Sequence, residues 1–343
     1  MKWKWTILYC CLLGLASCRK EQDTLPETAL VSPGSVLVLN EGNYTYGNAS
    51  VTWYHPDSTA IRQDLFEAVN NRPLGDVAQS MAVINGKGYL VVNNSSKIEV
   101  VNLSDFKSVA TITGLLSPRY LLPVSSSKAY VTDIYADKIH ILDLATQSKV
   151  GEIACSGWTE DILLANGKAW VVNYDSSRIE IIDPNTDQKI GSVPVPKSPS
   201  SMVSDTLGKL WVLSAGDNLQ SIAPTLSRID PSTQSVEWSQ TFPMGAAPTD
   251  LNIAPDGQRL YYFDQHIYSL NIADNVLPSV PIINASGRLF YTLGLSPDGG
   301  RLYAADAIDY NQRGKVYVYQ LPTLQPIDTF ASGIIPGYFY FVQ

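Results

Sequence analysis

The chain has 343 residues, of which 45% are hydrophobic and 16% are charged, so it can bury a large core and lacks the composition of a disordered protein. Lys and Arg total 24 against 32 Asp and Glu, which gives a formal net charge of −8. Because the average field of such a chain repels polyanions, we expect no nucleic acid among its partners. The length suits one all-β closed fold in a single domain.

Residues 1–17 are predicted to be a signal peptide and not part of the fold. Lys2 and Lys4 form a basic start, a mostly apolar run follows, and the segment ends in Leu15-Ala16-Ser17-Cys18. This ending resembles a bacterial lipobox, in which the cysteine is acylated and the chain is cut just before it. The resemblance implies a lipid on Cys18 that anchors the protein at a membrane surface. The alternatives are an ordinary secretion signal or a short anchor with an incidental cysteine.

Residues 18–33 are predicted to be a lipidated, flexible tether, because they contain Pro26 and Pro33 and no apolar period. Arg19-Lys20-Glu21-Gln22-Asp23 loosely resembles the charged surface-export signal of Bacteroidota lipoproteins. We therefore expect an outer-membrane lipoprotein that faces the cell surface, with a periplasm-facing position as the alternative. The lipid is expected to be its only membrane attachment, since no later segment approaches the roughly 20 apolar residues of a membrane helix. Processing leaves Cys155 as the one other cysteine, so no disulfide is expected.

Residues 34–343 are predicted to be built from a repeated unit of roughly 40 residues. One marker is an aromatic residue in a strand-like run, and a second is a turn of the type Asp183-Pro184-Asn185-Thr186. The turn marker occurs in seven copies. Two independent markers with the same period indicate a true repeat. The aromatic anchors are Tyr89, Tyr130, Trp170, Trp211, Tyr261 and Tyr303.

Each unit contains four short runs rich in β-branched and aromatic residues, which is the signature of a propeller blade. Residues 65–69 are the one candidate for a helical turn. The last run, residues 336–342, reads as a first strand without a second, and residues 35–40 read as a second strand without a first. Pairing them completes a blade and removes an exposed sheet edge. We predict an all-β, seven-bladed β-propeller over residues 34–343, closed by the C-terminal strand in the N-terminal blade.

Two segments carry a resemblance to a known group of propellers. Tyr130-Val131-Thr132-Asp133 and Trp170-Val171-Val172-Asn173 resemble the Tyr-Val-Thr-Asn motif of the YVTN or YncE-like families. The opening Val38-Leu39-Asn40-Glu41-Gly42-Asn43-Tyr44 is similar to that of lipoprotein propellers of Bacteroidota, which include surface proteins that capture cobalamin for a TonB-dependent transporter. The resemblance implies a propeller fold, a corrinoid ligand and an outer-membrane transporter as partner. Because propellers host many unrelated activities, it bears on fold more than on function.

The candidate ligand site lies on the loops that gather around one end of the channel, where propellers commonly place function. Aromatic and short polar residues alternate there, and the loops 40–48, 215–226 and 307–314 are longer than the repeat requires. Such a surface suits a large, flat, polar ligand, either a corrinoid or a glycan. The alternative for each residue is structural: tyrosine side chains would pack between neighbouring blades, and Asp and Asn side chains would cap turns. The predicted ligand-binding residues are Asn40, Glu41, Tyr44, Tyr46, Asn94, Arg119, Tyr120, Asp133, Tyr135, Trp158, Asp161, Tyr174, Asp250, Tyr291, Asp306, Tyr310 and Tyr338.

Few features favour catalysis, and we expect neither an enzyme nor a bound cofactor or metal. The histidines His55, His140 and His266 show no spacing typical of a metal or triad set, and no nucleophile elbow, Walker loop or Cys-x-x-Cys is present. One enzyme alternative stays open: a metal-dependent hydrolase of lactonase type, whose acidic ring would consist of Glu41, Asp133, Asp250 and Asp306.

The leading hypothesis is a surface-anchored module, monomeric by itself, that captures a nutrient and passes it to a transporter. The second is a scaffolding propeller that binds a protein on the same face. Bound divalent metal would favour the hydrolase, and a change in Trp158 emission with a corrinoid would favour the nutrient binder.

Overall fold

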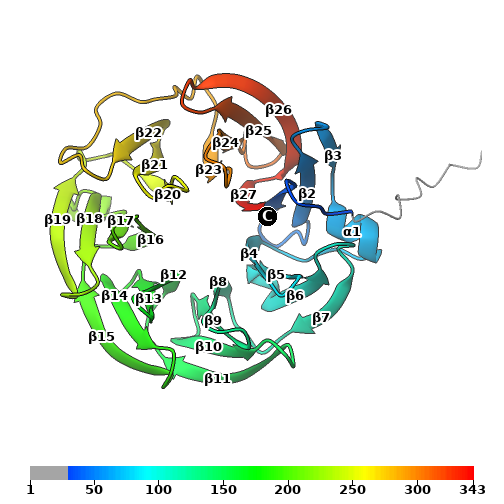
Figure 1. Cartoon of the computed structure of the whole chain (residues 1–343), viewed down its shortest axis with the longest axis horizontal. Coiled ribbons are helices and arrows are strands. Elements are labelled where there is room, and N and C mark those ends of the chain that lie inside the picture. Colours follow the sequence, from blue (N-terminus) through cyan, green and yellow to red (C-terminus); the bar gives the residue numbers. More distant parts are fainter. Residues whose placement is uncertain (1–29) are drawn as a thin grey trace, which may run out of the picture.

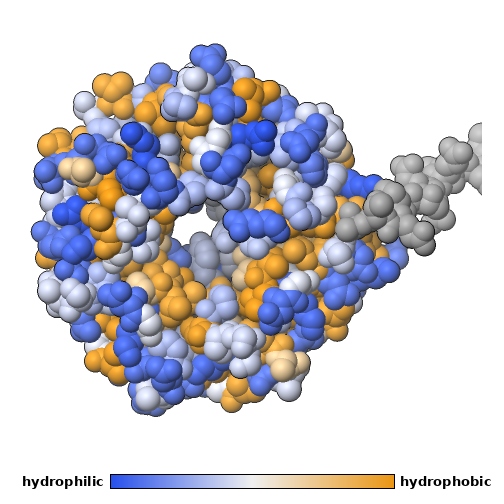
Figure 2. All heavy atoms as spheres, in the orientation of Figure 1, coloured by the Kyte–Doolittle hydropathy of each residue, from blue (hydrophilic) through white to orange (hydrophobic). Residues whose placement is uncertain are grey.

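A computed structural model describes residues 30–343, so the predictions for the signal peptide, for Cys18 and for residues 18–29 of the tether lie outside the described residues. Seven small antiparallel sheets stand side by side around a central channel (Figure 1). Figure 2 shows this channel as an opening at the centre of the molecule in the same orientation. The predicted seven-bladed β-propeller is confirmed.

The blades follow one another along the chain, and each of blades 2 to 7 begins at the channel with its innermost strand. Blade 1 contains the innermost strand β27 (Pro336–Phe341), β1 (Val36–Asn40), β2 (Ser50–His55) and β3 (Ala60–Arg62). Helix α1 (Leu65–Asn70) follows it, close to the predicted helical turn. Blade 2 contains β4 (Ala78–Ile84), β5 (Lys87–Val92), β6 (Lys97–Asn102) and β7 (Ser108–Ile112), with the 3-10 turn η1 (Asn93–Ser95) between β5 and β6.

The other five blades repeat this plan with one exception. Blade 3 contains β8 (Pro118–Pro123), β9 (Lys128–Asp133), β10 (Lys138–Asp143) and β11 (Ser148–Ala154); blade 4 contains β12 (Thr159–Ala165), β13 (Lys168–Asn173), β14 (Arg178–Asp183) and β15 (Gln188–Pro194). Blade 5 contains β16 (Pro199–Ser204), β17 (Leu210–Ser214), η2 (Asn218–Gln220), β18 (Thr225–Asp230) and β19 (Ser235–Thr241). Blade 6 contains β20 (Thr249–Ile253), β21 (Arg259–Asp264) and β22 (His266–Asn271); blade 7 contains β23 (Phe290–Leu295), β24 (Arg301–Asp306), β25 (Arg313–Gln320) and β26 (Gln325–Ile334).

Blade 6 departs from the predicted four strands, because its sheet has three. The segment after β22 contains Pro278 and Pro281, which have no backbone N–H to donate to a neighbouring strand. Its one β-bridge to the blade pairs Ile283 with Ile267. The two prolines therefore remove backbone donors from the segment that would form the fourth strand.

The middle strands of the blades are buried on both faces, because each sheet packs between two others. β5, β9 and β13 are almost fully buried along their length and read as nearly continuous apolar runs. The predicted aromatic anchors Tyr89, Tyr130 and Trp170 are each at most 1% exposed. Burial of such side chains contributes roughly 1.5–3 kcal/mol each, so the repeat carries much of the core.

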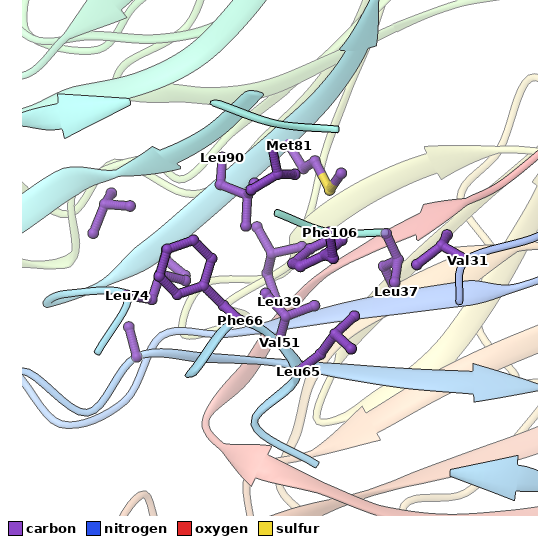
Figure 3. Close-up of a cluster of buried hydrophobic side chains, with 14 of the residues drawn as sticks. Val31, Leu37, Leu39, Val51, Leu65, Phe66, Leu74, Met81, Leu90 and Phe106 are labelled. Atoms are coloured by element: carbon purple, nitrogen blue, oxygen red, sulfur yellow. The ribbon is translucent and has the colours of Figure 1, made fainter. Parts of the chain in front are cut away.

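The ring closes as predicted, by antiparallel pairing of β27 with β1 from Val36–Phe341 to Leu39–Tyr338. The adjoining core joins blade 1 to blade 2 and includes α1, as Figure 3 shows for Leu37, Phe66 and Phe106. Val31 packs into the same cluster, so the described chain is already fixed to the blade before β1 begins. None of the described helices is both long and apolar enough to cross a membrane.

Candidate functional site

The innermost strands present two successive side chains to the channel at their starts. β4, β8, β12, β16, β20 and β23 each have a shifted register beside their first residue. Such a bulge breaks the regular alternation of side chains between the two faces of a strand. It can therefore direct two successive side chains toward the same space, here the channel. Equivalent positions on the seven innermost strands form an upper ring of Gln79, Arg119, Glu160, Ser200, Thr249, Tyr291 and Gly337, and a lower ring of Ser80, Tyr120, Asp161, Ser201, Asp250, Thr292 and Tyr338.

The upper ring lines a cavity of about 480 Å³ at the mouth of the channel, which we call the cup. All seven blades contribute to it. The cup therefore has walls held by the whole propeller, and most of its side chains start from strands. Further lining residues are Glu41, Phe263, Phe290 and Tyr310.

A buried ion pair forms one wall of the cup. The Arg119 Nη2 lies 2.5 Å from Glu160 Oε1, and the Arg119 guanidinium also donates to Gln79. The Trp158 indole N–H donates to the second oxygen of Glu160 at 2.5 Å. Burial works to lower the pKa of Arg119, but the carboxylate of Glu160 outweighs it and raises that pKa. Arg119 therefore stays charged and is fixed in place.

The opposite wall contains a second carboxyl group, that of Glu41. The Tyr291 hydroxyl donates to Glu41 Oε1 at 3.0 Å. Burial raises the pKa of Glu41, while this hydrogen bond and the charge of Arg119 act against the rise. A Cβ at Gly337 would lie 2.6 Å from Glu41 Oε1, so any larger residue there would displace Glu41.

Two acids of the lower ring lie deeper in the channel. Asp161 accepts from the backbone N–H of Met202 at 2.9 Å, and Asp250 accepts from the N–H of Leu293 at 2.5 Å. Each bond connects the innermost strands of neighbouring blades. Burial raises the pKa of Asp161 to about 6 and that of Asp250 to about 7. The channel thus contains two carboxyl groups that lack a cationic partner close by.

A second cavity of about 480 Å³, the side pocket, opens on the same end of the propeller. It is lined by Tyr174, Lys197, the start of the β17–β18 loop and the segment 246–249. It shares Ala247 and Thr249 with the cup. The Tyr174 ring stacks on Trp158 with ring centres 4.7 Å apart.

A family model described as "Domain of unknown function (DUF5074)" matches residues 34–299. The chain belongs to the DUF5074 family. No curated protein matches the chain.

Solved structures share the fold of this DUF5074 propeller at low sequence identity. A quinonprotein alcohol dehydrogenase-like protein of Bacteroides thetaiotaomicron is 17% identical with a TM-score of 0.71, over 91% of this chain and 79% of that one. A protein of Lactobacillus plantarum is 11% identical with a TM-score of 0.70, over 91% and 100%. The periplasmic gluconolactonase of Pseudomonas aeruginosa is 12% identical with a TM-score of 0.68, over 90% and 99%. Some neighbours are thus named as enzymes and others are not, and at these identities the likeness establishes the fold alone.

The structure brings about half of the predicted ligand residues together. The cup and the channel beneath it contain Glu41, Arg119, Tyr120, Asp161, Asp250, Tyr291, Tyr310 and Tyr338. Tyr174 lines the side pocket and packs against Trp158. Tyr44, Tyr46 and Tyr135 are 69%, 77% and 72% exposed, and they line neither the cup nor the side pocket.

Four predicted residues lie outside the cup and the side pocket, because their side chains form hydrogen bonds with neighbouring strands and turns. The Asn40 amide is fully buried in blade 1 and bonds to Thr52, Ser332 and the Gly333 N–H. Asn94 donates to Asp76 at 2.6 Å. Asp306 accepts from the N–H groups of Leu289 and Ile308. These side chains hold turns and strands instead of facing the cup.

Asp133 is the fourth, and it is 0% exposed. It accepts from His140 Nε2 at 3.1 Å and from the N–H of Ser117 at 2.8 Å. Burial works to raise the pKa of Asp133, but the bond to His140 and the backbone N–H groups outweigh it and lower that pKa. With Asp133 and Asp306 inside blades, the acidic ring of the hydrolase alternative does not form. Within residues 30–343, no group of three or more His, Cys, Asp or Glu side chains is placed to hold a metal ion.

The predicted ligand residues omit several that line the cup, namely Gln79, Glu160, Ser200, Thr249, Phe263 and Phe290. The repeat offers a signal for the first four. Each occupies the position of Arg119 on its own innermost strand, so aligning the blades on Arg119 points to them.

Proposed function

We propose that this DUF5074 chain is a lipid-anchored binding module that captures a small polar ligand in the cup, with a corrinoid or a glycan as the two candidates. The captured ligand would then pass to a TonB-dependent transporter of the outer membrane. Supporting this is one observation: residues of all seven blades, among them aromatic rings, carboxyl groups and a fixed guanidinium, face one cavity of about 480 Å³. Because the walls of such a cavity are already ordered, binding loses little free energy to ordering them.

The direction of the strands supports capture from outside. β1 begins near Gly34, in a pocket shared with the β2–β3 turn at Pro56 and Asp57, and runs to Asn40 and Glu41 at the cup. The described chain therefore enters the propeller at the end opposite the cup. A lipid on Cys18 would hold that end toward the membrane and leave the cup facing away from it. Localisation at the cell surface is part of the same proposal.

The exposed tyrosines around the cup favour a protein contact as a second role for this face. Tyr44, Tyr46 and Tyr135 stand on the β1–β2 and β9–β10 loops at the same end as the cup. Tyrosine is enriched at protein interfaces, where its ring supplies apolar area and its hydroxyl a hydrogen bond. We propose that these side chains contact the transporter, which gives the scaffolding alternative a defined place in the same molecule.

Calorimetric titration of the detergent-solubilised full-length protein tests the proposal. Cyanocobalamin and a panel of soluble oligosaccharides serve as probes. Tyr310→Ala removes a ring from the cup, and Tyr46→Ala removes an exposed ring outside it. We expect Tyr310→Ala to weaken binding by roughly 3- to 10-fold, since an aromatic contact is worth about 0.5–1.5 kcal/mol, and Tyr46→Ala to leave it unchanged. Absence of binding by every probe would refute ligand capture, and an equal loss in both variants would refute the cup as the site.

A further inference from the structure

The cup and the side pocket are neighbouring cavities at the same end of the propeller, and we call the surface that they form together the groove. Ala247 and Thr249 line both cavities, and they belong to the segment that leads into β20. Ala247 is exposed, and its backbone N–H is held by Asp264 Oδ1 at 3.0 Å. We call the place where the two cavities meet the passage. It is bordered by the small side chain of Ala247, whose backbone is held in place by Asp264. The groove extends outward from the channel across the loops of blades 4, 5 and 6.

Each cavity is lined by an aromatic ring that packs against a second ring. In the cup, Tyr291 and Tyr310 meet edge to face with ring centres 5.9 Å apart. At the side pocket, Tyr174 stacks on Trp158 at 4.7 Å. The indole N–H of Trp158 donates to Glu160, which lines the cup. This hydrogen bond links the position of the Trp158–Tyr174 pair to the wall of the cup. The groove thus has two aromatic platforms at separate places.

The polar groups of the groove suit a ligand with many hydroxyl groups. Carboxyl oxygens of Glu41 and Asp250 and the hydroxyl groups of Ser200 and Thr249 line the cup and accept hydrogen bonds from hydroxyl donors. Lys197 lines the side pocket and donates. Sugars combine such hydroxyl groups with apolar faces that pack on aromatic rings. Two separate platforms fit a chain of small rings better than one wide macrocycle.

We infer that the groove binds a linear oligosaccharide of at least two sugar rings, one against Tyr310 in the cup and the next beyond Ala247 against Tyr174. This inference rests on the proposed function and selects the glycan from its two candidate ligands. It assigns the side pocket as a second subsite, which the function of the cup alone does not require.

Length dependence of binding tests the inference. The probes are gluco-, xylo- and N-acetylglucosamine oligosaccharides of one to four units, titrated calorimetrically into the full-length protein. For the series that binds, we expect affinity to rise at least 10-fold from one unit to two or three units and then to level off. Equal affinity for one and three units would overturn the inference.

Ala247→Trp blocks the passage and separates the two subsites. We expect it to reduce trisaccharide affinity to that of the monosaccharide while leaving monosaccharide affinity unchanged. Ala136→Trp, on the β9–β10 loop at the same end of the propeller, is the matched control and should change neither. Tyr174→Ala removes the second platform without adding bulk, so it should also abolish the gain with length. Full length-dependent affinity in both the Ala247→Trp and Tyr174→Ala variants would place the ligand elsewhere.

The outcomes distinguish this inference from the function on which it rests. Binding of cyanocobalamin, with no response to any oligosaccharide, would overturn the bipartite glycan groove and leave ligand capture standing. Absence of binding by cyanocobalamin and by every oligosaccharide would overturn both.

Discussion

Replacing Asp250 by Asn should stabilise the propeller at neutral and alkaline pH. Burial raises the pKa of Asp250 from an ordinary 3.8 to about 7, so the folded protein holds this proton more tightly than the unfolded chain does. Stability contributed by this group is therefore present below about pH 4 and is lost as pH rises toward 7. At about 1.4 kcal/mol for each tenfold change in proton affinity, the full loss is about 4 kcal/mol. An Asn Oδ1 still accepts from the Leu293 N–H, so the variant avoids the ionisation cost and keeps the bond between blades.

Urea unfolding followed by tryptophan fluorescence at pH 4, 6 and 8 measures this effect. We expect Asp250→Asn to match the parent protein at pH 4 and to exceed it by about 2–4 kcal/mol at pH 8, allowing for a weaker bond from a neutral acceptor. Glu67→Gln on the exposed side of α1 controls for the lost charge. Asp230→Asn should act in the opposite direction at neutral pH, because Lys209 lowers the pKa of Asp230. Parallel pH profiles for the parent and Asp250→Asn would refute the reasoning.

Three further changes test other parts of the molecule. Arg119→Met leaves Glu160 buried without a counter-charge and should destabilise the fold by about 3–5 kcal/mol in urea unfolding, and adding Glu160→Gln should recover most of that loss. Asn40→Ala removes a buried amide that joins β1 to β2 and β26, so we expect a loss of about 2–3 kcal/mol, and an unchanged unfolding midpoint would contradict this role. Cys18→Ala should abolish incorporation of labelled fatty acid and release the protein from the membrane fraction, whereas persistent labelling would exclude Cys18 as the lipidated residue.

The fold could be predicted because the repeat marks the same buried positions in blade after blade. Tyr89, Tyr130 and Trp170 lie on equivalent middle strands, and each is packed between neighbouring sheets. The pairing of β1 with β27 was also predictable, since each strand lacked a partner within its own segment. The three-stranded blade 6 was missed because the turn markers of the repeat continue there, while Pro278 and Pro281 remove the donors of a fourth strand.

The site was harder to predict, because one residue along a strand decides whether a side chain faces the blade or the cup. Asn40 and Glu41 are neighbours in sequence, yet the amide is buried in blade 1 and the carboxyl group lines the cup. Asp133 and Asp250 are both near strand ends, but the first bonds to the N–H groups of the following turn and the second faces the channel. The bulges that direct residues into the channel leave no clear signal in residue type.

The shared blade 1 also has a consequence for how the protein is made. The first strand to be synthesised, β1, finds its channel-side partner only in β27, after the six other blades have been made. Until then β1 has a free edge on that side, and such edges pair readily with other chains. The contact is among the most distant in sequence that this fold allows, and contacts of that kind form slowly. Nascent molecules therefore have an interval in which all blades but one can be complete, and protection from aggregation during that interval depends on how fast the last strand arrives.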